Sequence, residues 1–238
     1  MKTIFAITLK SALRDPFLLF WSIFLPVGGT IGLGMFIKQP GYPFQIMTGM
    51  MASGIFFYTF TTAVFTVFSQ RRRGVYNLLR VTPMPLWKYI CAISGAWVLV
   101  SLLCMLLVLV TGTLLFGLTI SVLPVLMLLP MAFTAALGYV LLSFFVSGFC
   151  RTDLQASILT NIVSMPLLFC SSGFYAVDNA PVWFRTITRF NPFQWFVEGL
   201  RSALSFNAQG WLISLALLAA VAVLALLLAV RTFQFADA

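Results

Sequence analysis

The chain has 238 residues, of which 61% are hydrophobic and only 8% are charged. Soluble domains carry about 25% charged residues, so this composition excludes a soluble globular protein and indicates an integral membrane protein. The net charge of +9 is also found in nucleic-acid-binding proteins, but here the basic residues lie beside apolar segments, which favours anchoring at a membrane surface.

The first predicted element is an amphipathic helix over residues 1–16. Its apolar residues recur at helical spacing: Phe5, Leu9, Ala12 and Leu13. Lys10 and Arg14 share another face, as in helices that lie in the interface plane with their basic residues toward the headgroups. The segment either connects the spans mechanically to another element or simply precedes the first span.

Six segments are long and apolar enough to cross a bilayer, which takes about 20 residues for a hydrocarbon core about 30 Å thick. They are Phe17–Ile37, Met47–Phe68, Tyr89–Phe116, Leu123–Cys150, Ala156–Phe174 and Trp211–Val230. The sequence therefore predicts an all-α, polytopic membrane protein with six transmembrane helices. Residues 1–238 are predicted to form a single transmembrane domain, because the intervening segments are too short for a separate soluble domain.

Residues 70–88, which join the second and third spans, form a basic segment that we call the elbow. Each of Arg71–Arg73 costs about 2.5–3.5 kcal/mol at the bilayer centre, so this segment is expected to lie in water. A short amphipathic helix is predicted from apolar residues at i, i+3 and i+4: Val75, Leu78 and Leu79. Thr82-Pro83 ends that helix. The helix either meets a partner protein or rests on lipid.

The distribution of basic residues predicts the orientation in the membrane. If the N-terminus is cytoplasmic, ten of them fall on the cytoplasmic side: Lys2, Lys10, Arg14, Arg71, Arg72, Arg73, Arg80, Lys88, Arg151 and Arg231. Four fall on the other side: Lys38, Arg185, Arg189 and Arg201. Cytoplasmic loops carry the excess of Lys and Arg, so both termini are predicted to be cytoplasmic.

Polar and aromatic side chains inside two spans are candidates for a substrate pathway. In the second span, which mixes hydroxyls with phenyl rings, these are Phe57, Phe60 and Thr61. In the fifth span they are Asn161, whose amide needs a hydrogen-bond partner across helices, and Phe169. The alternatives are that the hydroxyls bond to carbonyls of their own helix and that Asn161 only clamps helices together.

Residues 175–210 are too polar to cross the bilayer and are dense in aromatic residues. Pro181 and Pro192 each open a segment that suits a short helix. We expect these helices to lie at, or dip into, the external interface. Glu198 and Arg201 are three residues apart on the second of them and form a candidate gate-stabilising pair, or else a surface pair of little energetic value.

The sequence offers little chemistry for catalysis or metal binding. It contains no histidine, and its four cysteines, at positions 91, 104, 150 and 170, form no CxxC motif. We therefore expect neither a metal site nor a disulfide framework. The five acidic residues form no paired motif, and no Walker A sequence occurs. No catalytic residue and no cofactor are expected in this chain.

Two motifs, in order along the chain, resemble the permease subunits of type-2 ATP-binding-cassette (ABC) exporters. The first is the basic elbow with its "L-L-x-x-T-P-x-x-x-W" pattern, which begins at Leu78. The second is "SSGFYAVDNAPVWFRTITRFNPFQWFVEGLR", Ser171–Arg201, with its small-Gly-aromatic run, N-P pair and final Leu-Arg. The resemblance extends through the six spans and the amphipathic N-terminal segment.

The resemblance implies an elbow that docks on a separate ABC ATPase, which binds ATP and Mg²⁺. Two ATPase copies and a second permease, identical or related, are implied as partners, along with membrane lipids and without nucleic acid. The residues that it assigns to coupling are Arg72, Gly74, Leu78, Leu79, Pro83, Arg151 and Asp153. Residues 175–210 would be external re-entrant helices, and the protein would lie in the cell (inner) membrane.

The elbow departs from the family pattern because it contains no carboxylate, whereas family members often carry glutamates there. We therefore expect the groove of the partner ATPase to be more acidic or more apolar. The expected function is export of an amphipathic or lipid-like small molecule, such as a drug, an antibiotic or a lipid-linked compound. The alternatives are an intramembrane lipid-modifying enzyme and a membrane-assembly subunit that does not transport.

Overall fold

The computed structural model describes residues 2–14, 20–37, 39, 41–75, 86–117, 121–175, 177 and 180–235. Every regular element within these residues is helical, which confirms the all-α prediction. The elements are α1 (Lys2–Arg14), η1 (Phe20–Phe24), α3 (Leu25–Phe36), α4 (Tyr42–Phe56), η2 (Phe57–Thr62), α5 (Ala63–Arg72), α7 (Leu86–Phe116), α8 (Val122–Gly148), α9 (Asp153–Phe169), α10 (Val182–Arg189), α11 (Pro192–Leu204) and α12 (Ala208–Phe235). The two η elements are π-helical turns that lead directly into α3 and α5.

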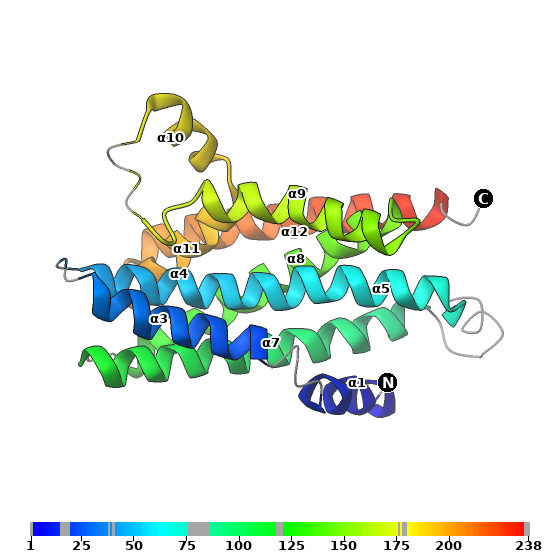
Figure 1. Ribbon diagram of the computed structural model, residues 1–238, viewed down its shortest axis with the longest axis horizontal. Helices are drawn as coiled ribbons and strands as arrows, with labels where there is room; N and C mark the ends of the chain where they lie inside the picture. Colours follow the sequence, from blue (N-terminus) through cyan, green and yellow to red (C-terminus); the bar gives the residue numbers. More distant parts are fainter. Residues whose placement is uncertain are drawn as a thin grey trace.

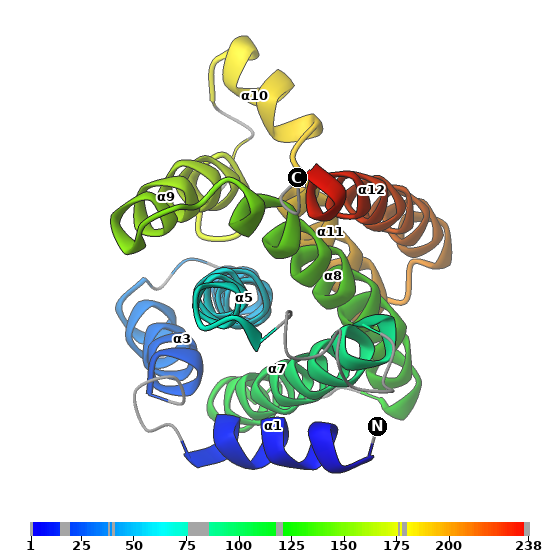
Figure 2. The same cartoon turned by 90° about the vertical axis from the view of Figure 1, so that its right-hand side faces the viewer.

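The long helices run side by side, and α1 lies crosswise against α7 on the side of the bundle, near one end (Figures 1 and 2). The last turn of α5, the first turn of α9 and the end of α12 lie at this same end (Figure 1). We call it the basic end, because Arg71–Arg73 lie there. Helices α10 and α11 and the first turn of α4 lie toward the opposite end (Figure 1). Helix α1 and the end of α12 thus lie toward the same end, and the cytoplasmic placement of both termini stays a prediction.

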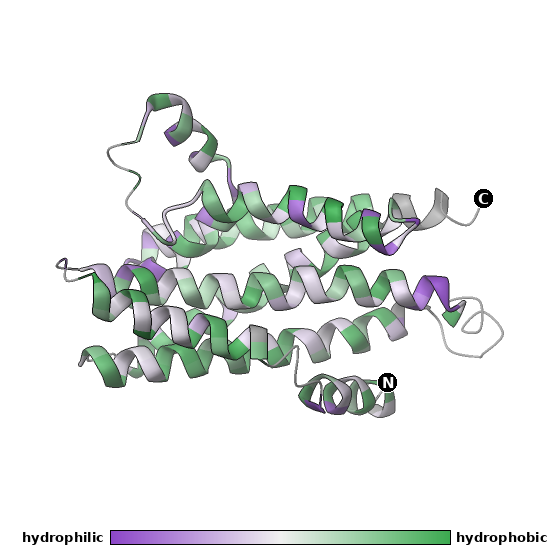
Figure 3. Cartoon of the chain, viewed as in Figure 1, coloured by the Kyte–Doolittle hydropathy of each residue, from purple (hydrophilic) through white to green (hydrophobic). Residues whose placement is uncertain are grey.

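Within the described residues, four helices are long and apolar enough to cross a membrane: Tyr42–Arg72, Lys88–Phe116, Val122–Gly148 and Ala208–Ala229. Two further apolar helices, Ser22–Phe36 and Asp153–Phe169, are shorter and coincide with the first and fifth predicted spans. At 1.5 Å per residue, 17 residues extend only about 25 Å. The bundle is mainly hydrophobic between its two ends (Figure 3). Multi-pass membrane character is thus supported, and the count of six spans stays a prediction.

The continuous helix α4–η2–α5 forms the centre of the molecule, with other helices packed around it (Figure 2). Phe56 on this helix stacks on Phe60, with ring centroids 5.2 Å apart. Edge-on contacts join Phe56 to Tyr139 of α8 at 4.9 Å and to Phe193 of α11 at 5.7 Å. Such aromatic pairs add to the packing that holds helices together, so this cluster binds α4, α8 and α11 into one core.

Several hydroxyls of the central helix bond to carbonyls of the same helix, one of the alternatives raised by the sequence. Thr59 Oγ1 donates to the Ile55 carbonyl at 2.6 Å, and Thr66 Oγ1 donates to the Thr62 carbonyl at 2.8 Å. Hydroxyls satisfied in this way are compatible with an apolar surrounding. Their presence in the second span therefore does not require a polar pathway.

The amphipathic N-terminal segment forms α1, whose apolar side is only partly available to lipid. Ala12 is buried, and Phe5 is half-buried beside Gly95 of α7. Ile7 and Leu13 are exposed, as are the basic residues Lys10 and Arg14. The helix thus uses part of its apolar surface to contact α7, and the rest is free for the membrane interface.

The fifth predicted span, Ala156–Phe174, differs from the observed helix at both ends. Helix α9 begins at Asp153, because the Thr152 hydroxyl accepts the Gln155 N–H and caps its first turn. It ends at Phe169, and the chain then turns back against α4. In this turn, Tyr42 Oη donates to the Phe174 carbonyl at 3.3 Å.

The two short helices expected in residues 175–210 are present as α10 and α11, but they lie in different surroundings. Helix α10 projects from the bundle (Figure 1). Helix α11 packs against α12, α8 and α4, and five of its apolar residues are fully buried: Phe193, Phe196, Val197, Leu200 and Ala203. It is thus a core element rather than a helix resting on the interface.

Gly49 of α4 lies against the turn after α9 so closely that a Cβ built there would overlap the Gly173 carbonyl. We predict that Gly49→Ala lowers the free energy of unfolding by about 1–3 kcal/mol, the usual cost of overpacking, because the obstacle is backbone. Thermal unfolding of the purified protein measures the effect. Gly28→Ala is the control, since a Cβ there meets nothing within 4 Å. Equal midpoints for the two variants would contradict the close contact.

Candidate functional site

The basic end brings together two of the residues expected to take part in coupling. Arg72, at the end of α5, forms an ion pair with Asp153, the first residue of α9, at 2.5 Å. Their side chains are 65% and 73% exposed, so the pair contributes little to stability. It does join the start of the elbow to the start of α9, and the two residues are 81 positions apart in sequence.

Local hydrogen bonds hold the two segments that carry this pair. Gly74 ends α5 with a φ of +69°, a left-handed conformation that favours glycine. Arg71 donates to the Ser147 carbonyl at 3.2 Å, which ties α5 to the last turn of α8. The backbone N–H of Arg151 donates to Gln155 Oε1 at 2.9 Å. Of the other predicted coupling residues, Leu78, Leu79 and Pro83 lie outside the described part of the chain.

The predicted pathway residues do not form one lining. Phe60 is fully buried in the aromatic core, so in this conformation it packs between helices. Phe57 is 37% exposed, and Thr61 is half-buried with no hydrogen-bond partner for its hydroxyl among the described residues. Asn161 and Phe169 are exposed on α9.

Helix α9 packs on the rest of the chain along one side, at whose centre runs a stripe of buried residues, and exposes its other side. The stripe consists of Ala156, Thr160, Ser164 and Leu168, four residues apart, all buried. Large apolar residues cover the exposed side: Leu154, Ile158, Ile162, Met165 and Phe169. Asn161 lies among them. An amide side chain facing hydrocarbon without a partner is unfavourable, so this surface is suited to contact with another helix.

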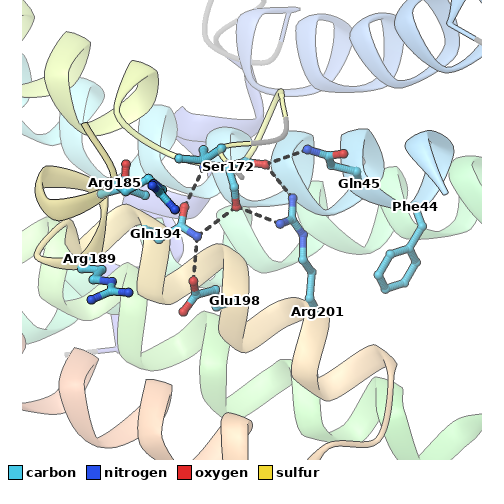
Figure 4. A pocket seen from close by; sticks show the side chains of 10 residues that line it. Phe44, Gln45, Ser172, Arg185, Arg189, Gln194, Glu198 and Arg201 are labelled. Carbon is cyan, nitrogen blue, oxygen red and sulfur yellow. Dashed lines mark hydrogen bonds between the residues drawn. The ribbon is translucent and has the colours of Figure 1, made fainter. Parts of the chain in front are cut away.

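At the opposite end, Arg201 of α11 is the centre of a polar network (Figure 4). Its guanidinium donates to Ser172 Oγ at 2.8 Å, to the Ser172 carbonyl at 2.7 Å and to Thr48 Oγ1 at 3.1 Å. Burial lowers the pKa of Arg201, and the negative charge of Glu198 opposes that shift. Arg201 is therefore a cation held between α4 and the turn after α9.

Glu198 and Arg201 do not form the direct pair that the sequence suggests. Hydrogen bonds through neighbouring residues connect them instead. Glu198 Oε1 accepts a hydrogen bond from Gln194 Nε2 at 2.7 Å. The same amide nitrogen donates to Ser172 Oγ at 2.9 Å, and Gln194 Oε1 accepts the Ser172 N–H at 2.6 Å. The two charged residues thus share a network that has Ser172 and Gln194 at its centre.

Several residues of this end were not selected from the sequence, notably Gln45, Ser172 and Gln194. A usable signal was present, since Gln194, Glu198 and Arg201 recur at i, i+4 and i+7 on an otherwise apolar segment. No comparable signal marks Gln45, which donates to the Ser172 carbonyl at 3.2 Å from a helix 127 residues away in sequence.

Comparison with known proteins supports the resemblance that the motifs suggested. A family model described as ABC-2 type transporter matches residues 1–205. The matched region contains the elbow, the loop before α9 and the whole of α11. No curated protein shows a significant match to the chain.

Replacing Arg201 tests whether the network at the opposite end stabilises the fold. We predict that Arg201→Gln lowers the free energy of unfolding by about 2–3 kcal/mol, because hydrogen bonds to a charged group are lost and the Ser172 carbonyl loses a donor. Thermal unfolding measures the loss. Arg189→Gln, at an exposed position, is the control and should change the value by less than about 0.5 kcal/mol. A loss no larger than that of the control would argue against a structural role of Arg201.

Proposed function

Because the chain belongs to the ABC-2 type transporter family, we propose that it is the permease subunit of an ATP-driven exporter. The observation that carries the proposal is the family match over residues 1–205, which includes both motifs. The cargo is an amphipathic or lipid-like small molecule, because the chain has a largely apolar surface and no large domain between its helices. ATP and Mg²⁺ are bound by a separate ABC ATPase.

The elbow is the proposed docking site for the ATPase. The Arg72–Asp153 pair supports this assignment, since movement of the elbow would pass directly to α9. Arg71 provides a second link, to α8. Closure of the ATPases would thus move α5 and α9 together, and the central position of α4–η2–α5 would carry this movement into the core. Sequence pattern alone assigns Leu78, Leu79 and Pro83 to the same docking surface.

A second permease copy, identical or related, is proposed to cover the exposed side of α9. Asn161 supports this, because it is exposed and makes no side-chain hydrogen bond among the described residues. A polar group within an apolar segment is stabilised by an interhelical partner. Phe57, Thr61 and Phe169 would then lie near the boundary between two permeases, where a cargo path is expected.

The proposed orientation follows from the distribution of charge. The basic end carries Arg71–Arg73 and Arg151, and cytoplasmic segments carry the excess of Lys and Arg. We therefore place the basic end and both termini in the cytoplasm, the six predicted spans in the cell (inner) membrane, and α10 and α11 at the external side. The Glu198–Arg201 network would then stabilise the external end of the transport path.

Exchanging the charges of the ion pair tests coupling. In the complex with a cognate ABC ATPase, we predict that Arg72→Glu lowers cargo-stimulated ATP hydrolysis about two- to fivefold, the range expected for an exposed pair. The double variant Arg72→Glu with Asp153→Arg should restore most of the stimulation.

Leu78→Asp with Leu79→Asp should abolish ATPase binding. Unchanged binding and hydrolysis in that variant would rule out the elbow as the docking site.

Cysteine crosslinking tests the proposed contact through α9. In a variant without the four native cysteines, we predict that Asn161→Cys gives a crosslinked permease dimer in membranes, because the two α9 helices would lie close together. Leu103→Cys is the control, since Leu103 is 46% exposed on α7. Crosslinking is read from the shift in gel mobility. Equal yields at the two positions would indicate random collision and contradict this interface.

A further inference from the structure

A cavity of about 710 Å³ lies at the external end, between α4, α10, α11 and the segment after α9 (Figure 4). Three of its lining residues are arginines, Arg185, Arg189 and Arg201, and one is an acid, Glu198. The described lining therefore carries two positive charges in excess. Arginine pairs with phosphate through two parallel hydrogen bonds, so the charge and geometry favour an anion.

Two of the three arginines make no side-chain contact of this kind within the part of the chain that the structure describes. Among the described residues, no hydrogen bond or ion pair is made by the side chains of Arg185 and Arg189. They are four residues apart, on the side of α10 that lines the cavity, and the buried Thr188 lies between them. Their donors are therefore free to bind a ligand.

The other side of α10 indicates at which level of the membrane the cavity lies. It exposes large apolar residues, Trp183, Ile187 and Phe190, which are 65%, 49% and 76% exposed. An amphipathic helix with aromatic residues at the end of a membrane-spanning bundle lies in the interface, with its apolar side toward the acyl chains. The two arginines beside the cavity are thus at headgroup depth.

Hydrogen bonds within the protein hold the inner wall of the cavity in place. Arg201 is held by Ser172 and Thr48, and Gln194 is buried and bonded to Ser172 and Glu198. Phe44 adds an apolar surface to the same space. Arg201 is thus a fixed cation at the back of the cavity, and Arg185 and Arg189 are at its front. Together with the apolar wall, they suit a ligand whose phosphate group is attached to an apolar body.

We propose that this cavity binds the phosphate headgroup of an anionic lipid from the surrounding outer leaflet. Arg185 and Arg189 contact the phosphate, and Arg201 attracts it from the back of the cavity. Glu198 weakens the binding through its negative charge. The lipid is a resident ligand that joins α10 to α11, and its binding does not depend on which cargo the transporter moves.

The experiment measures lipid affinity of the full-length chain. The protein is stripped of lipid in a neutral detergent and titrated with phosphatidylglycerol or phosphatidylcholine, and bound lipid is counted by native mass spectrometry. We expect phosphatidylglycerol to bind more tightly, and Arg185→Gln with Arg189→Gln to weaken it by at least about tenfold, since two charge-assisted contacts are lost. The matched control, Arg73→Gln with Arg151→Gln, removes the same charge at the basic end and should stay within about twofold of the original affinity.

Glu198→Gln provides an independent test with the opposite sign. It removes the one acid described in the lining and should raise the affinity for phosphatidylglycerol about threefold or more, whereas Asp153→Asn at the basic end should not. Thermal unfolding confirms that each variant is folded. An equal loss in the two double variants, or no gain in Glu198→Gln, would overturn the proposal. So would competition by inorganic phosphate at the concentration at which the lipid binds, because the site would then take a soluble anion.

Discussion

The buried turn after α9 satisfies its backbone carbonyls with donors from other parts of the chain, because a buried carbonyl left without a donor costs free energy. Asn191 Nδ2 donates to the carbonyls of Leu167 and Cys170, at 2.7 and 2.8 Å. Arg201 and Gln45 donate to the Ser172 carbonyl. These donors come from the start and end of α11 and from α4. The turn can therefore form only with α11 inserted into the bundle.

The shape of the end opposite the basic end follows from this network. Helix α9 is free to stop at Phe169 because its last carbonyls are bonded by Asn191, which also caps α11 by accepting the Phe193 N–H at 2.8 Å. The turn approaches α4 closely because Gly49 and Gly173 both lack side chains at the contact. With α11 fixed in the core, α10 projects beside it and leaves the arginine-lined cavity between them.

The two ends differ in how they use their charged residues. At the basic end, Arg71 and Arg72 contact α8 and α9, so they link elements that are expected to move together. At the opposite end, Arg201 is held in place, while the side chains of Arg185 and Arg189 make no hydrogen bond or ion pair with the described residues. An exposed ion pair can break and re-form at small cost, which suits a joint between moving parts. A network of buried hydrogen bonds is costly to open, which suits a fixed support.

Much of the architecture could be predicted from the sequence, because hydropathy and charge act locally. Unbroken apolar runs can only be helices in a bilayer, and Arg71–Arg73 mark a segment that stays in water whatever surrounds it. The two short helices followed from Pro181 and Pro192. Side-chain environments were harder to predict. Phe60 resembled Phe57 in sequence, but only the packing of α8 and α11 decides that Phe60 is enclosed and Phe57 is not.

The sequence by itself thus determined that the chain is helical, enters a membrane repeatedly and carries a basic elbow, since each of these properties depends on residues that are near neighbours. The tertiary structure alone decided that Arg72 meets Asp153, that Arg201 bonds to Ser172 and Thr48 rather than to Glu198, and that three arginines surround one cavity. These contacts join residues from about 30 to more than 150 positions apart. No local pattern encodes them, because they arise only when helices from different parts of the chain pack together.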